Sequence, residues 1–399
     1  ELLPASSTDI TFDNNTSLTN YCPCRWDRIL LTGTTTELIM DDASMSGALR
    51  GIMATNEAPI ELIDSDFDNN LVSVYLNNFS TGGSFNGSYL KVDGCSFDAT
   101  VAPSTICYSS SSVNMSTVYP TSSICGDPTM DIIVKNSVDV HVGHENYDPN
   151  TFENNSGNDK TAIVPDASRV YVRNNLFYGV TAICSDNDSK LIVGGTLAQG
   201  NIIEDCSAYF NESAMFFEEN YMSGSSLELT EPQYEEVATG YDKGTEFNNN
   251  SFYESDLFID GNGNPDESTL IIYDNIFTFT EVEMIDYPVK FGGIFPNLRR
   301  ITFHSNDMVQ NNNATLVKVE DCSYMLMANN DFDNLVYRTP SNGNEYKGVK
   351  WKNSVDGVVS NNYFRNFNRA MDVHGDNSGV NHVDGTQFTC NDFVNCYYP

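Results

Sequence analysis

The stretch Trp351–Val373, WKNSVDGVVSNNYFRNFNRAMDV, contains one complete unit of a repeating structure. Apolar and polar residues alternate from 355 to 360, and Asn361-Asn362 forms a turn. Tyr363-Phe364 begins a second short strand, and Ala370–Val373 is a third. Three short strands that are joined by turns, with no helix between them, predict a single rung of a β-helix.

The same unit recurs along the chain as a polar residue, usually Asn, two positions before a large apolar residue. The copies are about 24 to 32 residues apart, or twice that distance where one is missed, which is the length of a solenoid coil. The clearest pairs are Asn175/Phe177, Asn201/Ile203, Asn250/Phe252, Asn275/Phe277, Asn306/Met308, Asn330/Phe332, Asn362/Phe364 and Asn391/Phe393. Earlier copies are Ser65/Phe67, Cys95/Phe97 and Glu145/Tyr147.

A steric argument explains this pairing of residue types. The sharp corner of a triangular coil needs a residue near left-handed φ and ψ, which Asn tolerates better than any residue except Gly. Stacked coils place like side chains about 4.8 Å apart, so the amides can form a ladder and the rings a stack. We therefore expect the asparagines at corners and these rings inside: Phe177, Phe252, Phe277, Phe332, Phe364 and Phe393.

Three rungs, 356–364, 169–177 and 324–332, resemble the repeat of right-handed parallel β-helices of the pectin-lyase-like superfamily. The resemblance covers roughly residues 60 to 396 and implies an all-β solenoid of roughly a dozen coils. It does not imply one activity, because that superfamily contains lyases, hydrolases, tailspikes, adhesins and surface proteins. The sequence motifs of the pectate lyases and of the polygalacturonases are absent.

The composition is strongly acidic, with 20 Lys and Arg against 55 Asp and Glu and a formal net charge of -35. Such a charge repels nucleic acid, anionic lipid and acidic polysaccharide, and it favours a solvated surface that collects divalent cations. No run of 18 apolar residues occurs, so the sequence predicts no membrane span.

Ten cysteines without a zinc-binding or redox spacing predict a secreted, disulfide-bonded protein, with buried thiols as the alternative. The candidate bridges are Cys107–Cys125, Cys184–Cys206 and Cys390–Cys396. The chain begins at Glu1 without Met, as a processed product does.

Ten glycosylation sequons, most of them at predicted turns, indicate an extracellular or cell-surface glycoprotein. They begin at Asn14, Asn15, Asn78, Asn86, Asn114, Asn154, Asn187, Asn211, Asn249 and Asn313.

The repeat is least regular in three places. Residues 1–55 predict an N-terminal cap or an assembly segment ahead of a β-helix over 56–399. A Ser- and Thr-rich excursion is expected at 107–125 and an acidic, aromatic one at 208–247. The second excursion is either a ligand contact or a cover over the side of the helix.

One turn resembles the start of a calcium loop, with oxygen ligands at alternate positions Asp260, Asn262, Asn264 and Asp266. Pro265 and Ile271 stand where an EF-hand requires Gly and Glu, so the alternatives are a simpler calcium turn and a plain solvated turn. No cofactor is required.

The nearest approach to a catalytic constellation is Asp372-Val-His-Gly-Asp376. Alternation along a strand would place Asp372, His374 and Asp376 on one face. The competing interpretation is that His374 is simply solvated in a turn.

These observations favour a non-enzymatic structural protein that assembles with copies of itself, head to tail, into a filament or coat. The expected open edge is the last coil, which has no amphipathic helix after it. The alternative is a carbohydrate-active or carbohydrate-binding β-helix that uses 208–247 to contact a neutral glycan.

Overall fold

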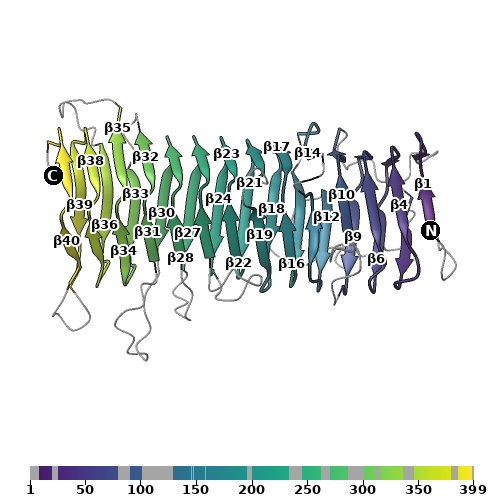
Figure 1. Ribbon diagram of the computed structural model, residues 1–399, viewed down its shortest axis with the longest axis horizontal. Coiled ribbons are helices and arrows are strands. Elements are labelled where there is room, and N and C mark those ends of the chain that lie inside the picture. Colours follow the sequence, from purple (N-terminus) through teal and green to yellow (C-terminus); the bar gives the residue numbers. More distant parts are fainter. Residues whose placement is uncertain are drawn as a thin grey trace. The chain divides into compact units, whose positions relative to one another are not determined.

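The computed structural model describes most of the chain, in fourteen stretches that are joined through undescribed residues. They are 9–19, 26–79, 90–100, 129–144, 146, 148–157, 159–195, 200–232, 245–261, 270–285, 301–310, 315–335, 346–378 and 385–397. Contacts divide the chain into two compact units, Glu1–Ser213 and Ala214–Pro399. In the described part every element is a strand, and all strand pairs are parallel, as Figure 1 shows for each unit.

The first unit contains four stacks of strands, each named here by its first strand. The β1 stack holds β1 (Ile10–Phe12), β4 (Leu38–Asp41), β7 (Ile60–Ile63) and β10 (Leu90–Asp93). The β13 stack holds β13 (Val140–Val142), β16 (Arg169–Val172) and β19 (Lys190–Gly194). The β2 stack holds β2 (Ser17–Leu18), β5 (Ser44–Ser46), β8 (Asp66–Asp68), β11 (Ser96–Asp98), β14 (Asn150–Glu153), β17 (Asn175–Tyr178) and β20 (Ile202–Glu204). The β3 stack holds β3 (Ile29–Thr32), β6 (Arg50–Thr55), β9 (Val72–Asn77), β12 (Thr129–Lys135), β15 (Lys160–Asp166), β18 (Thr181–Ser185) and β21 (Ser207–Asn211).

The second unit contains three stacks. The β22 stack holds β22 (Ala214–Glu218), β25 (Thr245–Asn248), β28 (Leu270–Tyr273), β31 (Ile301–His304), β34 (Met325–Ala328), β37 (Val358–Ser360) and β40 (Gln387–Thr389). The β23 stack holds β23 (Tyr221–Ser223), β26 (Ser251–Tyr253), β29 (Ile276–Thr278), β32 (Asp307–Gln310), β35 (Asp331–Asn334), β38 (Tyr363–Arg365) and β41 (Asp392–Val394). The β24 stack holds β24 (Ser226–Thr230), β27 (Asp256–Asp260), β30 (Glu281–Ile285), β33 (Thr315–Glu320), β36 (Lys347–Lys352) and β39 (Arg369–His374).

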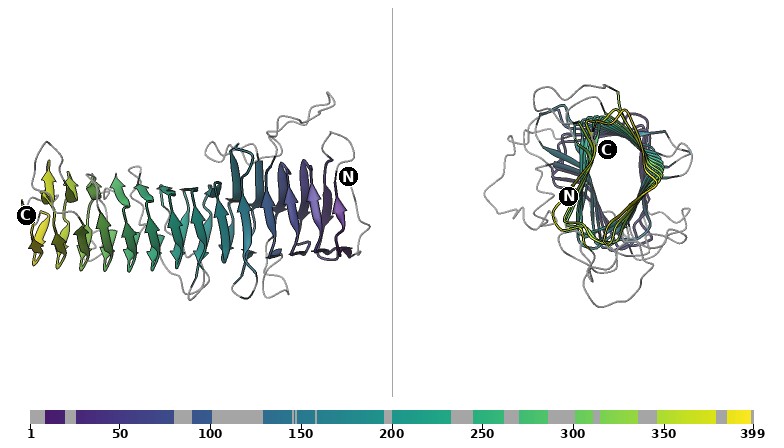
Figure 2. Two further views of the ribbon diagram at one scale, coloured as in Figure 1. Left: turned by 90° about the horizontal axis from the view of Figure 1, so that it is seen from above. Right: turned by 90° about the vertical axis from the view of Figure 1, so that its left-hand side faces the viewer.

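Each coil of the second unit visits the three stacks in turn, as β22, β23 and β24 do. Seen end on in Figure 2, the strands of the C-terminal coils wind around one axis. This connectivity, with each strand pairing in parallel with the strand one coil away, is a parallel β-helix and confirms the predicted fold class.

The predicted ring stack is present in both units. Phe97 lies 4.7 Å from Phe152 in the first unit, and Phe332 lies 4.6 Å from Phe364 in the second, measured between ring centroids. These distances match the spacing of hydrogen-bonded strands, because each coil contributes one ring. Five of the six predicted phenylalanines are at most 1% exposed, namely Phe177, Phe252, Phe277, Phe332 and Phe364.

Phe393 differs from the other five because it is 37% exposed. It stacks on Phe364 at 5.3 Å, so its ring follows the same column. Its other face is open because, in the described part of the chain, β41 pairs only with β38.

The asparagine ladder is present, but the asparagines that form it do not have the left-handed backbone conformation that was predicted for them. In the second unit Asn250 Nδ2 donates to Asn275 Oδ1 at 2.9 Å, and the main-chain N–H of Asn250 donates to the same oxygen at 2.9 Å. The left-handed residue is the one before, Asn249 with φ 56° and Asp274 with φ 54°. The prediction that the ladder asparagine makes the corner is therefore wrong, because that side chain turns inward and its predecessor takes the strained conformation.

The ladder also contains residues that the sequence pattern missed. Asn150 donates to Asn175 Oδ1 at 3.0 Å, and Asn220 donates to Asn250 Oδ1 at 3.2 Å. The first of these replaces the predicted copy Glu145/Tyr147, two residues that lie outside the described ranges.

Two predicted irregular segments belong to the regular coils. Residues 10–18 and 29–55 contain β1 to β6, so the described part of 1–55 is β-helix rather than a separate cap. Residues 207–230 and 245–248 form β21 to β25. The excursion over 208–247 is wrong there because its aromatic side chains are core residues, such as Phe217 at 0% exposure. Residues 233–244, and the predicted excursion and bridge at 107–125, lie outside the described residues.

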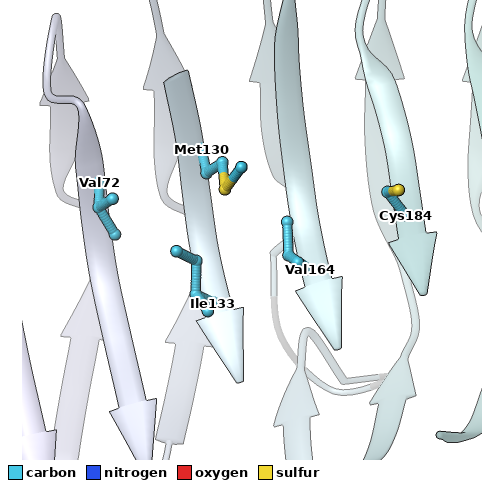
Figure 3. Close-up of a cluster of buried hydrophobic side chains, with 5 residues drawn as sticks. All are labelled: Val72, Met130, Ile133, Val164 and Cys184. Carbon is cyan, nitrogen blue, oxygen red and sulfur yellow. The ribbon is translucent and has the colours of Figure 1, made fainter. Parts of the chain in front are cut away.

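A second apolar layer covers part of the outer side of the β3 stack. Figure 3 shows Val72, Met130, Ile133, Val164 and Cys184, all at most 1% exposed. Tyr75 and Tyr209, which are partly buried, pack against this cluster. Ile133 is in register with Tyr75 and Val164, on the side chain face that points away from the interior. Ile133, Val164 and Cys184 are therefore buried although they point outward.

Candidate functional site

The predicted constellation around Asp372 is an ion-pair cluster on the outer face of β39. Asp372 is 3% exposed. Lys347 Nζ lies 2.6 Å from its Oδ2, while Arg369 Nη1 and His374 Nε2 each lie 2.6 Å from its Oδ1. Burial alone would raise the pKa of Asp372, but the bonds from these three side chains hold it well below its ordinary value.

Asp376 does not join this cluster. The strand ends at His374, and Gly375 follows with φ 73°. A Cβ at Gly375 would lie 1.8 Å from Asn353 Oδ1, so the turn needs glycine. Beyond it, Asp376 accepts a hydrogen bond from the Ser378 amide at 3.0 Å. The prediction that Asp372, His374 and Asp376 share one face is correct for the first two only, because the strand stops before the third.

The cluster belongs to a wider charged face that the sequence did not predict. Lys318, Lys350 and Asp372 are in register on three adjacent strands, and Glu320, Lys352 and His374 form a parallel row. Lys318 pairs with Glu281 and Glu283, and Lys352 pairs with Glu320. In the described ranges Lys350 makes no ion pair. Most charges on this face therefore neutralise one another.

A second polar group lies on the outer face of the β22 stack. Tyr273 Oη donates to Glu246 Oε1 at 2.7 Å, and Asn248 Nδ2 donates to Glu218 Oε1 at 2.9 Å. Burial and then the bond to Glu246 raise the pKa of Tyr273, with Glu218 adding to the effect. The His304 ring stacks on Tyr273 at 5.3 Å. The phenol is therefore bonded to one carboxylate, and a second carboxylate lies one coil further along the same face.

The sequons occupy corners of the coils wherever they are described and exposed. The five exposed ones all have left-handed backbones, with φ between 48° and 69°, and are Asn14, Asn15, Asn78, Asn187 and Asn249. Asn154 and Asn211 are half-buried, and Asn86, Asn114 and Asn313 lie outside the described residues. Glycosylation of any of them stays a prediction.

The cysteines correct two predicted bridges. Cys206 carries a thiol, so it does not pair with Cys184, and Cys390 and Cys396 are both thiols. Cys206 is buried in the coil, and burial raises its pKa to about 11. A buried thiol packs as a small apolar group, which suits this inward position, and its Sγ donates to the Glu204 carbonyl at 3.0 Å.

The predicted calcium turn stays untested, because of its four ligands only Asp260, at the end of β27, lies in the described ranges. Within those ranges no three His, Cys, Asp or Glu side chains form a group suited to a metal ion. No helix there is long and apolar enough to cross a bilayer.

Comparisons with known proteins add structural matches only. No protein-family model and no curated protein matches the chain. A mannuronic acid-specific polysaccharide lyase from human gut microbiota matches over 98% of this chain and 81% of its own, with 10% identity and a TM-score of 0.33. A periplasmic alginate epimerase matches over 97% and 84%, with 11% identity and a TM-score of 0.25. The catalytic domain of an α-1,3-glucanase matches over 98% and 60%, with 10% identity and a TM-score of 0.17. The chain is a parallel β-helix protein.

Proposed function

We propose that this protein is a secreted or cell-surface structural protein, a β-helix that carries N-linked glycans and joins copies of itself end to end. The observation that carries the proposal is the position of the sequons. Asn14, Asn15, Asn78, Asn187 and Asn249 are exposed at corners, where a glycan can be attached without disturbing the coil.

The glycans are tested by intact mass. The chain produced in secretory eukaryotic cells should lose mass on enzymatic deglycosylation, and replacement of the five exposed asparagines by Gln should remove most of that difference. An unchanged mass after deglycosylation would overturn the glycoprotein proposal.

End-to-end association is supported by the last coil of the second unit. Within the described residues, β39, β40 and β41 each pair on one side only. An unpaired strand is a template for another chain. The coil also exposes apolar side chains between 37% and 53%, namely Val373, Phe388, Phe393, Val394 and Tyr397.

A second copy supplies matching edges. In the described part, β1, β2 and β3 each pair only with the next coil, and the proposed contact pairs these three strands with the three strands of the last coil of another copy. A contact between different ends does not close, so it propagates into a filament.

Electron microscopy and light scattering at micromolar concentration test this association. Filaments are expected for the wild-type chain, and Val373→Lys with Phe393→Lys should abolish them because both place charge in the contact. Tyr253→Lys, which changes an exposed residue on a side face, is the control. Monodisperse wild-type monomers would refute self-assembly.

A second candidate function, action on a neutral glycan, is favoured by the group around Tyr273. Glu246 accepts the hydrogen bond of its hydroxyl, and Glu218 lies on the adjacent coil beyond Glu246, so one face carries two carboxylates, the groups that acid–base chemistry on a sugar uses. Release of reducing ends from neutral polysaccharides, lost in Glu246→Gln, is the test. No release from a broad panel would leave the structural role alone.

A further inference from the structure

An apolar strip crosses the outer face of the β23 stack, next to one of the sequons. Tyr221 is 39% exposed, Tyr253 38% and Ile276 48%. They lie on β23, β26 and β29, where the alternate residues Met222, Phe252 and Phe277 are buried. The strip is therefore on the outward face of three adjacent coils.

Ser251 lies in the middle of this strip. It is in register with Tyr221 on one side and with Ile276 on the other. Ser251 is also the third residue of the sequon that begins at Asn249. The acceptor asparagine is thus two residues from the centre of the apolar strip.

The side chain of Asn249 is directed toward the coil that carries Tyr221. Asn249 is exposed at the corner before β26, with φ 56°. Its Nδ2 donates a hydrogen bond to Glu219 Oε1, and Glu219 is the corner residue two positions before Tyr221. An asparagine amide has two N–H groups, so the bond to Glu219 can persist after one hydrogen is replaced by a sugar.

We propose that a glycan attached at Asn249 packs on the strip formed by Tyr221, Tyr253 and Ile276, so that its first sugars are held on the protein surface. This proposal rests on the proposed glycosylation. N-acetylglucosamine presents apolar C–H faces, and aromatic side chains combine an apolar ring with a polar tip, which suits a sugar face and its hydroxyl edge. The sugar would cover apolar surface that is otherwise exposed to water.

Asn187 provides a matched comparison within the chain. It is an exposed, left-handed sequon residue with φ 58°, and its Nδ2 also donates to a carboxylate of the preceding coil, Asp166 Oδ1, at 2.9 Å. At the Asn249 site, the residue two positions after the bonded carboxylate is the exposed Tyr221. At the Asn187 site, the residue two positions after Asp166 is Ser168, which is buried. The two sites share an exposed left-handed asparagine that is bonded to a carboxylate, and they differ in the exposed ring beside it.

The test compares removal of the glycan from the two sites in the folded chain. The full chain is produced in secretory eukaryotic cells, site occupancy is measured by glycopeptide mass spectrometry, and an endoglycosidase is added to native protein. We expect removal at Asn249 to be about tenfold slower than at Asn187, the factor that corresponds to about 1.4 kcal/mol of packing. Tyr221→Ser with Tyr253→Ser should make the rates equal, and Tyr221→Phe, which keeps the ring, should preserve the difference.

Three outcomes separate this inference from the proposed function. An occupied Asn249 that is trimmed as fast as Asn187 in the wild-type chain overturns the packing. Occupancy at other sequons with none at Asn249 also overturns it, while the glycoprotein proposal stands. No glycan at any sequon overturns the proposed function and this inference together.

Discussion

Replacing one ladder asparagine tests whether the buried asparagine, rather than the left-handed residue before it, stabilises each corner. Asn306 is 0% exposed, and its Nδ2 donates to Asn330 Oδ1 at 3.0 Å and to the Ile272 carbonyl at 3.1 Å. Its Oδ1 accepts from the main-chain N–H and from Nδ2 of Asn275, both at 3.1 Å. Asn306→Leu keeps a similar volume but removes all four bonds.

The magnitude follows from the groups that lose their partners. The Asn275 N–H and the Ile272 carbonyl are main-chain groups that would lose these bonds, and each unsatisfied buried group costs about 1 to 3 kcal/mol. We therefore expect Asn306→Leu to lower the free energy of unfolding by about 2 to 6 kcal/mol. Asn329, the exposed corner residue with φ 56°, is the control. Asn329→Gly should change stability by at most about 0.5 kcal/mol, because Gly adopts left-handed angles without strain.

Urea denaturation followed by circular dichroism gives the free energies. Hydrogen exchange of β31 and β32 localises the effect, since coils of a solenoid can unfold separately. A cost below about 1 kcal/mol for Asn306→Leu, or an equal cost for Asn329→Gly, would refute the assignment of the ladder.

Four other measurements check separate parts of the structure. Phe332→Ala should cost about 3 to 5 kcal/mol in urea denaturation, since its ring is fully buried against Phe364. Burial raises the pKa of Asp131 to about 6 despite the ion pair with Lys160 at 3.0 Å. Stability should therefore fall as pH rises from about 4 to about 6, and Asp131→Asn should flatten that part of the urea midpoint profile. The pKa of Asp372 is lowered in the folded chain. The carboxylate therefore contributes its full stabilisation at pH values above its ordinary pKa, and this stabilisation is lost as the pH falls below that value toward the lowered pKa. Asp372→Asn should weaken the loss of stability in acid, and an unchanged acid limb would contradict the ion-pair cluster. Last, melting temperature at low ionic strength should rise with NaCl and with millimolar calcium, because both screen a net charge of -35, and equal values in chelator and calcium would reject a metal contribution.

The fold could be predicted from the sequence because a solenoid repeats its steric problem in every coil. One inward ring and one inward amide per coil recur at nearly constant spacing, so Phe332 and Asn330 carry a signal that a single sheet would not give. The prediction of an excursion over 208–247 is wrong because it rests on the acidic and aromatic composition as a sign of a surface loop, although Asn220 and Met222 form a ladder pair like Asn306 and Met308 and Phe217 is buried.

The charged face could not be predicted, because it depends on lateral register. Lys318, Lys350 and Asp372 are neighbours only when the lengths of the intervening turns are known, and those turns vary from coil to coil. The same limit applies to the two roles within an Asn-Asn pair. Asn329 and Asn330 are chemically identical in the sequence, and only the backbone path decides that the first is a left-handed corner and the second a buried ladder residue.

Many of the acidic residues lie at the corners of the coils, and this position affects which contacts between molecules are repelled. Of the 32 described non-glycine residues with positive φ, 14 are Asn and 13 are Asp or Glu. Asn adopts that conformation readily, but Glu does not. Backbone preference therefore does not explain why Glu occupies five of these corners, namely Glu57, Glu212, Glu219, Glu231 and Glu254. Acidic corners repel other acidic surfaces that approach from the side. The last coil instead exposes apolar side chains such as Phe388 and Phe393, so the repulsion opposes lateral contacts more strongly than contacts at this end. This asymmetry is what an end-to-end assembly requires.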